Sequence, residues 1–234
     1  EKIAMVNSQE LDLKQWKRPE DTNPEQCNDG VVDARGANWK AIKLGKLNLN
    51  KAKLCRCDLR GADLSLCDLS ETDLRLAKYD SETKFPDGFD IYTSGAVGPG
   101  AKLNGAFLNG TDLREMDLRK SSLIGAYLSG SDLSGALLDG VSLAGADLRS
   151  AILRGAMCRE TRFGTSELDM ADFRGANLSG ANLDNVESIR GADFTLCTGM
   201  DGLVQKLLSR SNHELDCWNP LTRSTTRTSL ESLL

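Results

Sequence analysis

Side chains able to do acid–base, nucleophilic or metal chemistry are sparse in this chain of 234 residues. His213 is the single histidine, so neither a histidine-based triad nor a His-rich metal site is expected. His213 and Cys217 could share a metal ion, but the nearby sequence offers no two further ligands. Neither a Walker lysine loop nor a dinucleotide-binding fingerprint is present. We therefore expect no enzyme activity, no metal ion and no cofactor.

The cysteines number seven, so a monomer keeps at least one free thiol. Three occupy positions that the repeat described below points inward, where a thiol acts as a small apolar group: Cys57, Cys67 and Cys158. Cys55 is expected to point outward. Cys27, Cys197 and Cys217 lie in or beside the end segments. A Cys197–Cys217 disulfide is the pair that best suits an oxidising compartment, although the sequence alone assigns no pairing.

Charged side chains are unevenly distributed along the chain. The net charge is -5, yet residues 35–60 carry eight basic side chains against Asp58 alone. We name these eight the basic collar: Arg35, Lys40, Lys43, Lys46, Lys51, Lys53, Arg56 and Arg60. Two interpretations stay open. The collar is either a solvated face paired with nearby acidic residues, or a docking surface for an acidic protein, an anionic headgroup or nucleic acid.

A five-residue repeat must position these side chains. From Leu103 to Leu183 every fifth residue is Leu fourteen times, Phe twice and Cys once, with a mostly small residue two places before it. A period of five fits neither one face of an α-helix nor one face of a flat strand. Each unit must therefore be a short extended segment followed by a turn, which suits the Gly found two residues after the Leu in ten of the seventeen units. A chain that turns the same way in every unit winds into a solenoid around a Leu core.

The units ADLRS, ANLSG, ADFRG and SDLSG resemble the A-(D/N)-L-x-x signature of the pentapeptide repeat family, and the resemblance covers residues 31–197. It implies an all-β fold, a right-handed quadrilateral β-helix with short helical terminal caps, one unit per face and four units per coil. It does not imply one activity.

The implied coil predicts which outward side chains are neighbours. It places Lys43 over Asp63, Lys53 over Asp73, Arg119 over Asp139 and Arg149 over Asp169. It leaves four members of the basic collar without an acidic neighbour on the next coil, and these are our candidate partner-binding residues: Lys40, Lys46, Arg56 and Arg60.

The register divides a single-domain chain into five segments. Residues 1–30 are expected to form an N-terminal cap segment with a helix over 9–16, and 31–79 a first repeat block. Residues 80–100 form an inserted loop and 101–197 a second repeat block, in which the register slips by one residue after Leu183 and Phe194 closes the last unit. Residues 198–234 are expected to form a C-terminal helical cap and tail, with Asp201 capping a helix over 202–210. Such caps would cover the exposed edges of the coil.

The inserted loop and the tail carry a second resemblance. KFPDGFD, residues 84–90, resembles a K-F-P-x-G-F-D insert of cyanobacterial and plastid members, and the tail NPLTRSTTRTSL resembles their closing segment. Phe85 and Phe89 are expected to anchor an ordered loop, because a polar tether needs no aromatic side chains. Both are also candidate partner-binding residues, since loops often carry function. A structural loop and a recognition loop both stay open.

These features predict a non-enzymatic interaction module, a scaffold or accessory subunit of a larger assembly in a plastid, at the thylakoid, or in a cyanobacterial cell. The alternative is a DNA-mimicking regulator of topoisomerase (gyrase), which needs a continuous acidic face that the basic collar argues against. We expect protein partners with an acidic surface, no nucleic acid, no membrane span, and a monomer or a dimer through a terminal cap. The numbering starts at Glu1 without Met, so a targeting peptide could have been removed.

Overall fold

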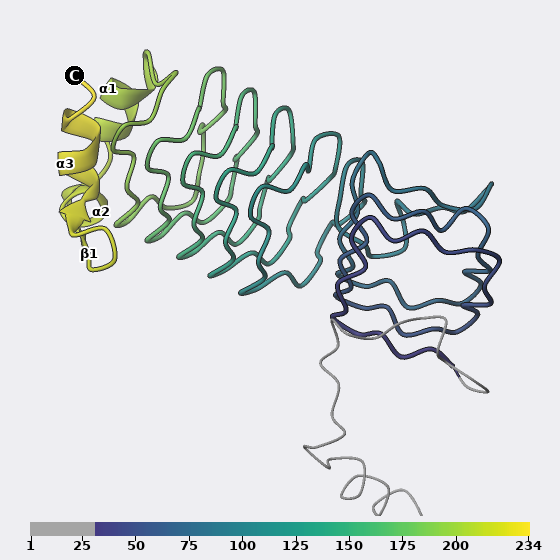
Figure 1. Cartoon of the computed structure of the whole chain (residues 1–234). Coiled ribbons are helices and arrows are strands. Elements are labelled where there is room, and N and C mark those ends of the chain that lie inside the picture. The colour runs from purple at the N-terminus through teal and green to yellow at the C-terminus, as the bar shows by residue number, and fades with distance from the viewer. Residues whose placement is uncertain (1–30) are drawn as a thin grey trace, which may run out of the picture. The chain divides into compact units, whose positions relative to one another are not determined.

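A computed structural model describes residues 31–234 (Figure 1). The predicted cap over residues 1–30, with its helix and Cys27, lies outside the described residues. Where the sequence predicts a single domain, the chain divides into two compact units. Unit 1 ends at Ala96, and unit 2 spans Val97–Leu234. The division falls within the inserted loop, where the chain leaves the five-residue register.

Each unit contains a coil whose successive turns are joined by parallel one-residue bridges. The bridges link residues twenty apart, such as Lys43 with Asp63 in unit 1 and Ser122 with Ser142 in unit 2. The backbone N–H of Leu103 donates to the carbonyl of Ser122 at 2.8 Å, and the N–H of Ser122 donates to the carbonyl of Ala101 at 2.9 Å. Four five-residue units therefore make one turn of a β-helix solenoid. The right-handed, quadrilateral form of that coil stays a prediction.

The inward column of unit 2 has the predicted composition. Leu123, Leu143 and Phe163 are fully buried, and Leu103 and Leu183 are 3% exposed. Small side chains two residues before them are buried as well, because two positions on one extended segment share a face. The predicted inward thiols of Cys57, Cys67 and Cys158 are also buried, which confirms their positions.

The residue two places after each inward side chain makes the turn. At this position the backbone of unit 2 is left-handed, with φ of 63° at Gly125, 63° at Lys120 and 56° at Thr165. Eight of these turn residues carry a side chain: Glu115, Lys120, Ser150, Glu160, Thr165, Met170, Asn185 and Leu196. A left-handed backbone is unfavourable for such residues, so the repeat maintains its geometry even where glycine is absent.

The coil tolerates single extra residues at defined places. The bridge spacing grows from twenty to twenty-one residues between Asp63 and Lys84, and again between Glu167 and Ser188. The second change is the predicted slip after Leu183. Phe194 is fully buried at the end of that coil, and its ring stacks on Phe173 with centroids 5.3 Å apart. The slip thus moves a turn without disturbing the core.

Short helices and one strand pair follow the coil of unit 2 (Figure 1). In order they are α1 (Leu203–Leu208), α2 (Asn212–Leu215), β1 (Trp218–Asn219), β2 (Ser224–Thr225) and α3 (Thr226–Glu231). The strands β1 and β2 are antiparallel. Asp201 does not cap α1 as predicted. The N-cap is Gly202, whose left-handed φ of 75° makes the helix begin at Leu203.

These C-terminal elements satisfy backbone groups of the last turn of the coil. The N–H of Ile189 donates to Glu214 at 3.0 Å, and the hydroxyl of Thr226 donates to the carbonyl of Ile189 at 3.1 Å. The buried amide of Asn219 donates to the carbonyl of Gly191 at 2.8 Å. The segment therefore covers a sheet edge that would otherwise be free to pair with another chain. Within residues 31–234, no helix has the length and apolar character needed to cross a membrane.

Candidate functional site

Half of the basic collar in unit 1 is paired with acidic side chains. The guanidinium of Arg35 lies 2.7 Å from Asp33, and Lys51 lies 3.9 Å from Glu71. Backbone bridges place Lys53 beside Asp33 and Asp73, and Lys43 beside Asp63, so both predicted pairs are neighbours on adjacent turns. Neither lysine forms an ion pair within residues 31–234, and Asp63 pairs instead with Lys84 at 3.5 Å.

Lys40 and Arg60, which we expected to lack an acidic neighbour, share one. The two Arg60 nitrogens lie 2.9 and 2.6 Å from the Asp58 oxygens, and the Lys40 ammonium lies 4.0 Å away. Burial raises the pKa of Asp58, but hydrogen bonds from Arg60 outweigh it, and the pKa stays below its ordinary value. The shared carboxylate does not come from the next coil, because Asp58 and Arg60 lie two residues apart on one outward face.

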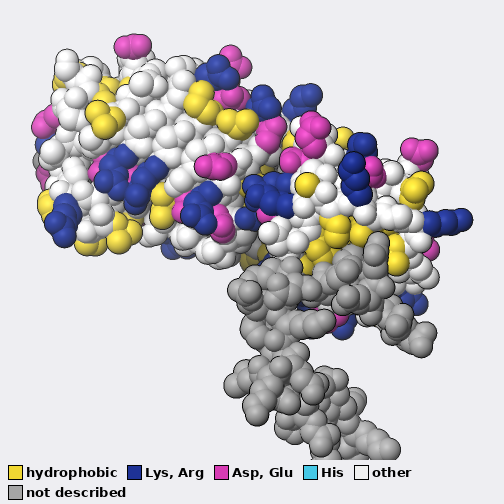
Figure 2. Space-filling view, in the orientation of Figure 1, with side chains coloured by type: hydrophobic (Ala, Val, Ile, Leu, Met, Phe, Trp, Pro, Cys, Tyr) yellow, Lys and Arg dark blue, Asp and Glu magenta, His cyan; other side chains and the backbone are white. Residues whose placement is uncertain are grey.

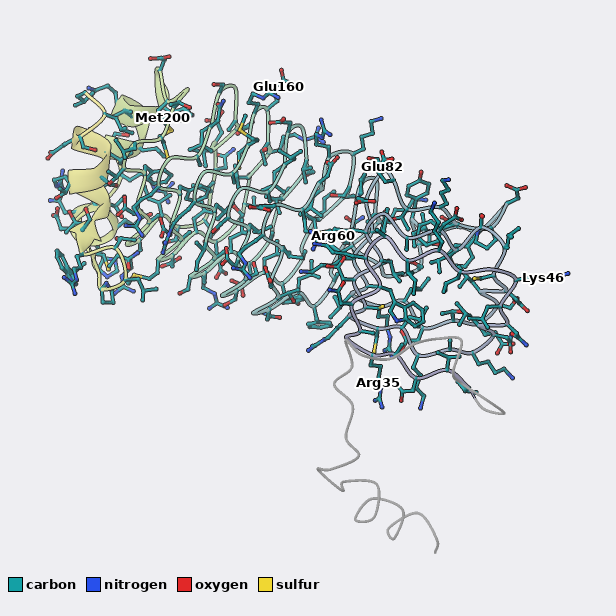
Figure 3. All side chains as sticks on the ribbon, viewed as in Figure 1. Arg35, Lys46, Arg60, Glu82, Glu160 and Met200 are labelled. Carbon is teal, nitrogen blue, oxygen red and sulfur yellow. The ribbon has the colours of Figure 1, made fainter. Side chains whose placement is uncertain are left out.

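Lys46 and Arg56 keep their charges exposed. Both residues are exposed, and neither side chain forms a hydrogen bond or ion pair within residues 31–234. In Figure 3 Lys46 extends away from the coil of unit 1, on the opposite side from Arg60. The four candidate basic residues therefore do not form one continuous patch.

Phe85 and Phe89 pack on the coil of unit 1. The Phe85 ring meets Tyr79 edge to face with centroids 5.9 Å apart, and it stacks on Phe89 at 5.8 Å. Both phenylalanines are half-buried, whereas Tyr92 of the same loop is 50% exposed. Asp80 ties the start of the loop down by accepting from the N–H of Gly61 at 2.9 Å. Phe85 and Phe89 therefore have a packing role, and their part in recognition stays a prediction.

Four arginines on the coil of unit 2 pair with the carboxylate two residues before them, whereas Arg154 and Arg159 pair with Asp172 and Asp139 on an adjacent turn. Arg119 lies 2.8 Å from Asp117, and Arg149 lies 2.8 Å from Asp147. Asp139 and Asp169 on the next coil also lie near these arginines, as predicted, since the negative charge of each raises the pKa of its arginine. An aspartate before the inward residue and an arginine after it project from the same face, so they form an ion pair within one unit wherever the sequence supplies both. On the face shown in Figure 2, dark blue and magenta side chains accordingly lie side by side.

The cysteines within residues 31–234 form no disulfide. Cys197 and Cys217, the pair named for an oxidising compartment, are both free thiols in the structure. The Cys197 thiol is buried and donates to the carbonyl of Phe173 at 3.0 Å. In the described part of the chain, no group of three or more His, Cys, Asp or Glu side chains could hold a metal ion.

Sequence reasoning missed a groove on unit 2 of about 570 Å³. Residues around Leu143, Phe163 and Leu183 line it, among them Ala144, Arg162 and Gly164. They are far apart in sequence but lie on adjacent turns of the coil. Comparing positions twenty apart for small outward residues could have revealed it.

The twenty-residue ladder, the buried leucine column and the five-residue unit define a class, that of β-helix solenoid proteins. The sequence model of the family described as pentapeptide repeats matches this chain with eight copies of the repeat, over residues 43–78, 100–135, 131–168 and 158–198. The chain belongs to the pentapeptide repeat family.

Solved structures of the family resemble the chain. A pentapeptide repeat protein from the Arabidopsis thaliana thylakoid lumen is 32% identical, with 63% of this chain and 98% of that chain covered and a TM-score of 0.43. QnrB1, a plasmid-mediated fluoroquinolone resistance protein, is 19% identical, with 68% and 77% covered and a TM-score of 0.41. HetL, from a Nostoc cyanobacterium and involved in heterocyst differentiation regulation, is 26% identical, with 75% and 92% covered and a TM-score of 0.25. Among curated proteins, none matches significantly.

Proposed function

We propose that the protein is a non-enzymatic interaction module that docks an acidic protein surface through unit 1. The exposed charges of Lys46 and Arg56 carry this proposal, because neither side chain has an ion pair within residues 31–234. Four other members of the basic collar are paired: Arg35, Lys40, Lys51 and Arg60. Lys40 and Arg60 share Asp58, and Arg60 lies on the opposite side of the coil from Lys46, so this pair is not part of the surface around Lys46. The partner is held by charge at the exposed surface of unit 1, so its affinity falls as the salt concentration rises.

The setting we propose is a larger assembly in a plastid, at the thylakoid, or in a cyanobacterial cell, with this protein as scaffold or accessory subunit. The KFPDGFD loop and the tail support it by their resemblance to such members. We further propose the right-handed, quadrilateral coil that the family resemblance implies.

The alternative, a DNA-mimicking gyrase regulator, needs a continuous run of unpaired carboxylates. Asp117 and Asp147 are instead held by the arginines two residues on, which supports the interaction module over the mimic. A supercoiling assay with gyrase checks this directly: we expect no effect of the purified protein, and inhibition or protection would favour the mimic.

The test of docking is affinity capture from a chloroplast or cyanobacterial extract with the full chain as bait. Lys46→Glu combined with Arg56→Glu should lose the salt-sensitive partners of the wild type. A matched control, Lys102→Glu with Lys120→Glu, makes the same charge change on unit 2 and should retain them. Arg60 is left unchanged because its guanidinium holds Asp58. Equal capture by both variants would refute docking through the collar.

A further inference from the structure

The groove on unit 2 is built by the register of the coil. Its floor lies on the residues that directly follow Leu143 and Phe163, namely Ala144 and Gly164. The same position carries Ile124 one turn before and Asp184 one turn after, so two small residues lie between two larger ones. The volume of about 570 Å³ falls within the range of ligand clefts, about 300–1,000 Å³.

Gly164 is small for reasons of space rather than backbone geometry. Its φ lies outside the left-handed region, unlike the glycines of the turns, and a Cβ added there would lie 3.6 Å from the carbonyl of Asp184. That is an ordinary van der Waals distance, so the fold accepts a side chain at this position. The sequence instead leaves the floor of the groove open.

Arg162 gives the groove an uncompensated positive charge. Its bridge partners on the adjacent turns are the neutral Ser142 and Asn182, and within residues 31–234 its guanidinium has no hydrogen bond or ion pair. Six other arginines on the coil of unit 2 each hold a carboxylate: Arg114, Arg119, Arg149, Arg154, Arg159 and Arg174. The remaining charge in the groove, Asp184, is paired with Lys206. The groove is therefore complementary to an anion.

Ile124 provides the apolar part of the surface. It is 47% exposed, and Tyr127, three residues on, is 44% exposed. Tyr127 stacks on Phe107, which is 75% exposed, with ring centroids 4.8 Å apart and the planes 6° apart. Of these three side chains Ile124 lines the groove, and exposed apolar side chains of this kind are typical of interaction sites.

We propose that this groove binds an extended acidic peptide segment of a partner protein. A carboxylate of the peptide pairs with Arg162, and a neighbouring aliphatic side chain lies over Ala144 and Gly164 against Ile124. A segment suits the site better than a small molecule, because the lining is open and a cleft for a small molecule buries most of its ligand. The segment binds through side chains rather than as an added strand, since the backbone groups here already bond to adjacent turns, as Gly145 N does to Gly164 O at 2.9 Å.

This inference extends the proposed interaction function to a second surface, and its test is separate. Random linear peptides displayed on phage are selected on the immobilised full chain, and the enriched sequences are synthesised and measured by fluorescence anisotropy. We expect enrichment of peptides with an acidic residue next to an aliphatic one. Arg162→Gln should weaken their binding by about tenfold, the equivalent of ~1.4 kcal/mol. Gly164→Leu, which fills the groove, should abolish it.

Gly45→Leu is the matched control. Gly45 holds the equivalent repeat position in unit 1, also with ordinary φ and with open space around it, so this variant should bind as the wild type does. The Lys46→Glu, Arg56→Glu variant should also bind the peptides, which separates this site from the collar. Failure to enrich peptides, binding unaffected by Arg162→Gln, or full displacement by millimolar acetate would each overturn the proposal. If Gly164→Leu does not fold, the exposed Arg162→Gln variant still decides the question.

Discussion

The turn residue of each five-residue unit has a backbone that glycine adopts freely and other residues do not. Lys120, at φ 63°, is exposed. A left-handed backbone costs a residue with a Cβ about 1–2 kcal/mol, while glycine loses about 0.5–1 kcal/mol of chain entropy on folding. Lys120→Gly should therefore raise the free energy of unfolding of unit 2 by up to ~1 kcal/mol, as measured by denaturant titration.

The reverse change provides the control. Gly130 has φ 66° and open space around its Cα, so Gly130→Lys introduces the backbone cost without a clash. It should lower the free energy of unfolding by about 1 kcal/mol. A shift of both variants in the same direction would contradict the backbone account.

Asp172 is the buried member of the aspartate–arginine pairs and should dominate their pH dependence. Its carboxylate accepts from Arg174 at 2.9 Å and from Arg154 at 2.6 Å. Burial raises its pKa, but these hydrogen bonds outweigh burial and leave the pKa below the ordinary 3.8. Because its pKa is lower in the folded protein than in the unfolded chain, Asp172 contributes its full stabilisation at pH values above the ordinary pKa. This stabilisation is lost as the pH falls through the folded-state pKa. The melting temperature should thus drop below about pH 4.

Asp172→Asn should cost about 2 kcal/mol at neutral pH and flatten that acid dependence, measured by thermal unfolding from pH 7 to pH 2. Asp112→Asn alters a pair with the same spacing whose carboxylate is 52% exposed, and it should cost less than ~1 kcal/mol. Similar losses from the two substitutions would be inconsistent with a role for burial.

At the scale of elements, the inserted loop is stabilised by aromatic packing. Phe85 lies between Tyr79 and Phe89, so Phe85→Ala removes two ring contacts and a half-buried side chain. We expect a loss of about 2–3 kcal/mol in unit 1, since such contacts add to the burial term. Tyr92→Ala, at a half-exposed position of the same loop, should change stability by less than ~0.5 kcal/mol. Amide hydrogen exchange across residues 80–96 would locate either effect.

The sequence predicts the inward positions of these elements well. Leu143 and Phe163 recur at a period that only a repeating turn can place inside, so their burial follows from spacing. Outward pairs are harder, because Asp147 and Asp169 are both near Arg149 and only the geometry of the turn selects between them.

In the candidate site, too, the sequence predicts which residues are exposed but not which side chains pair. That Lys46 and Arg56 are exposed follows from the repeat, whereas the sharing of Asp58 by Lys40 and Arg60 depends on side-chain directions that spacing does not give. The groove around Gly164 was missed because its small size matters only beside residues twenty places away.

At the scale of the whole molecule, the regular ladder of unit 2 predicts that one full turn can be removed. Deleting residues 126–145 joins Gly125 to Ala146, which holds the same position as Ala126 one turn later. Each turn contacts mainly its neighbours, so the shortened unit should still unfold cooperatively, with the loss limited to the contributions of one turn. Circular dichroism during thermal unfolding measures this.

A deletion of residues 126–143 provides the comparison. It leaves two extra residues, Ala144 and Gly145, at the join and places the following leucine out of register. This shorter deletion should melt at a lower temperature than the longer one. If removing more of the chain proves the more damaging change, the turn is not the cooperative building block of unit 2.

The buried thiols give each unit a chemical reporter of its own opening. Burial raises the pKa of Cys57 in unit 1 and of Cys197 in unit 2 to about 12, and raises that of Cys158 as well. Thiols react with alkylating reagents as thiolates, so these side chains are inert until the surrounding turn separates and admits both water and reagent. Alkylation followed over time by mass spectrometry would therefore record, for each cysteine, how often the surrounding part of the solenoid opens locally. Cys55 and Cys217 are partly exposed, so their alkylation rates would serve as the reference for thiols that react without local opening.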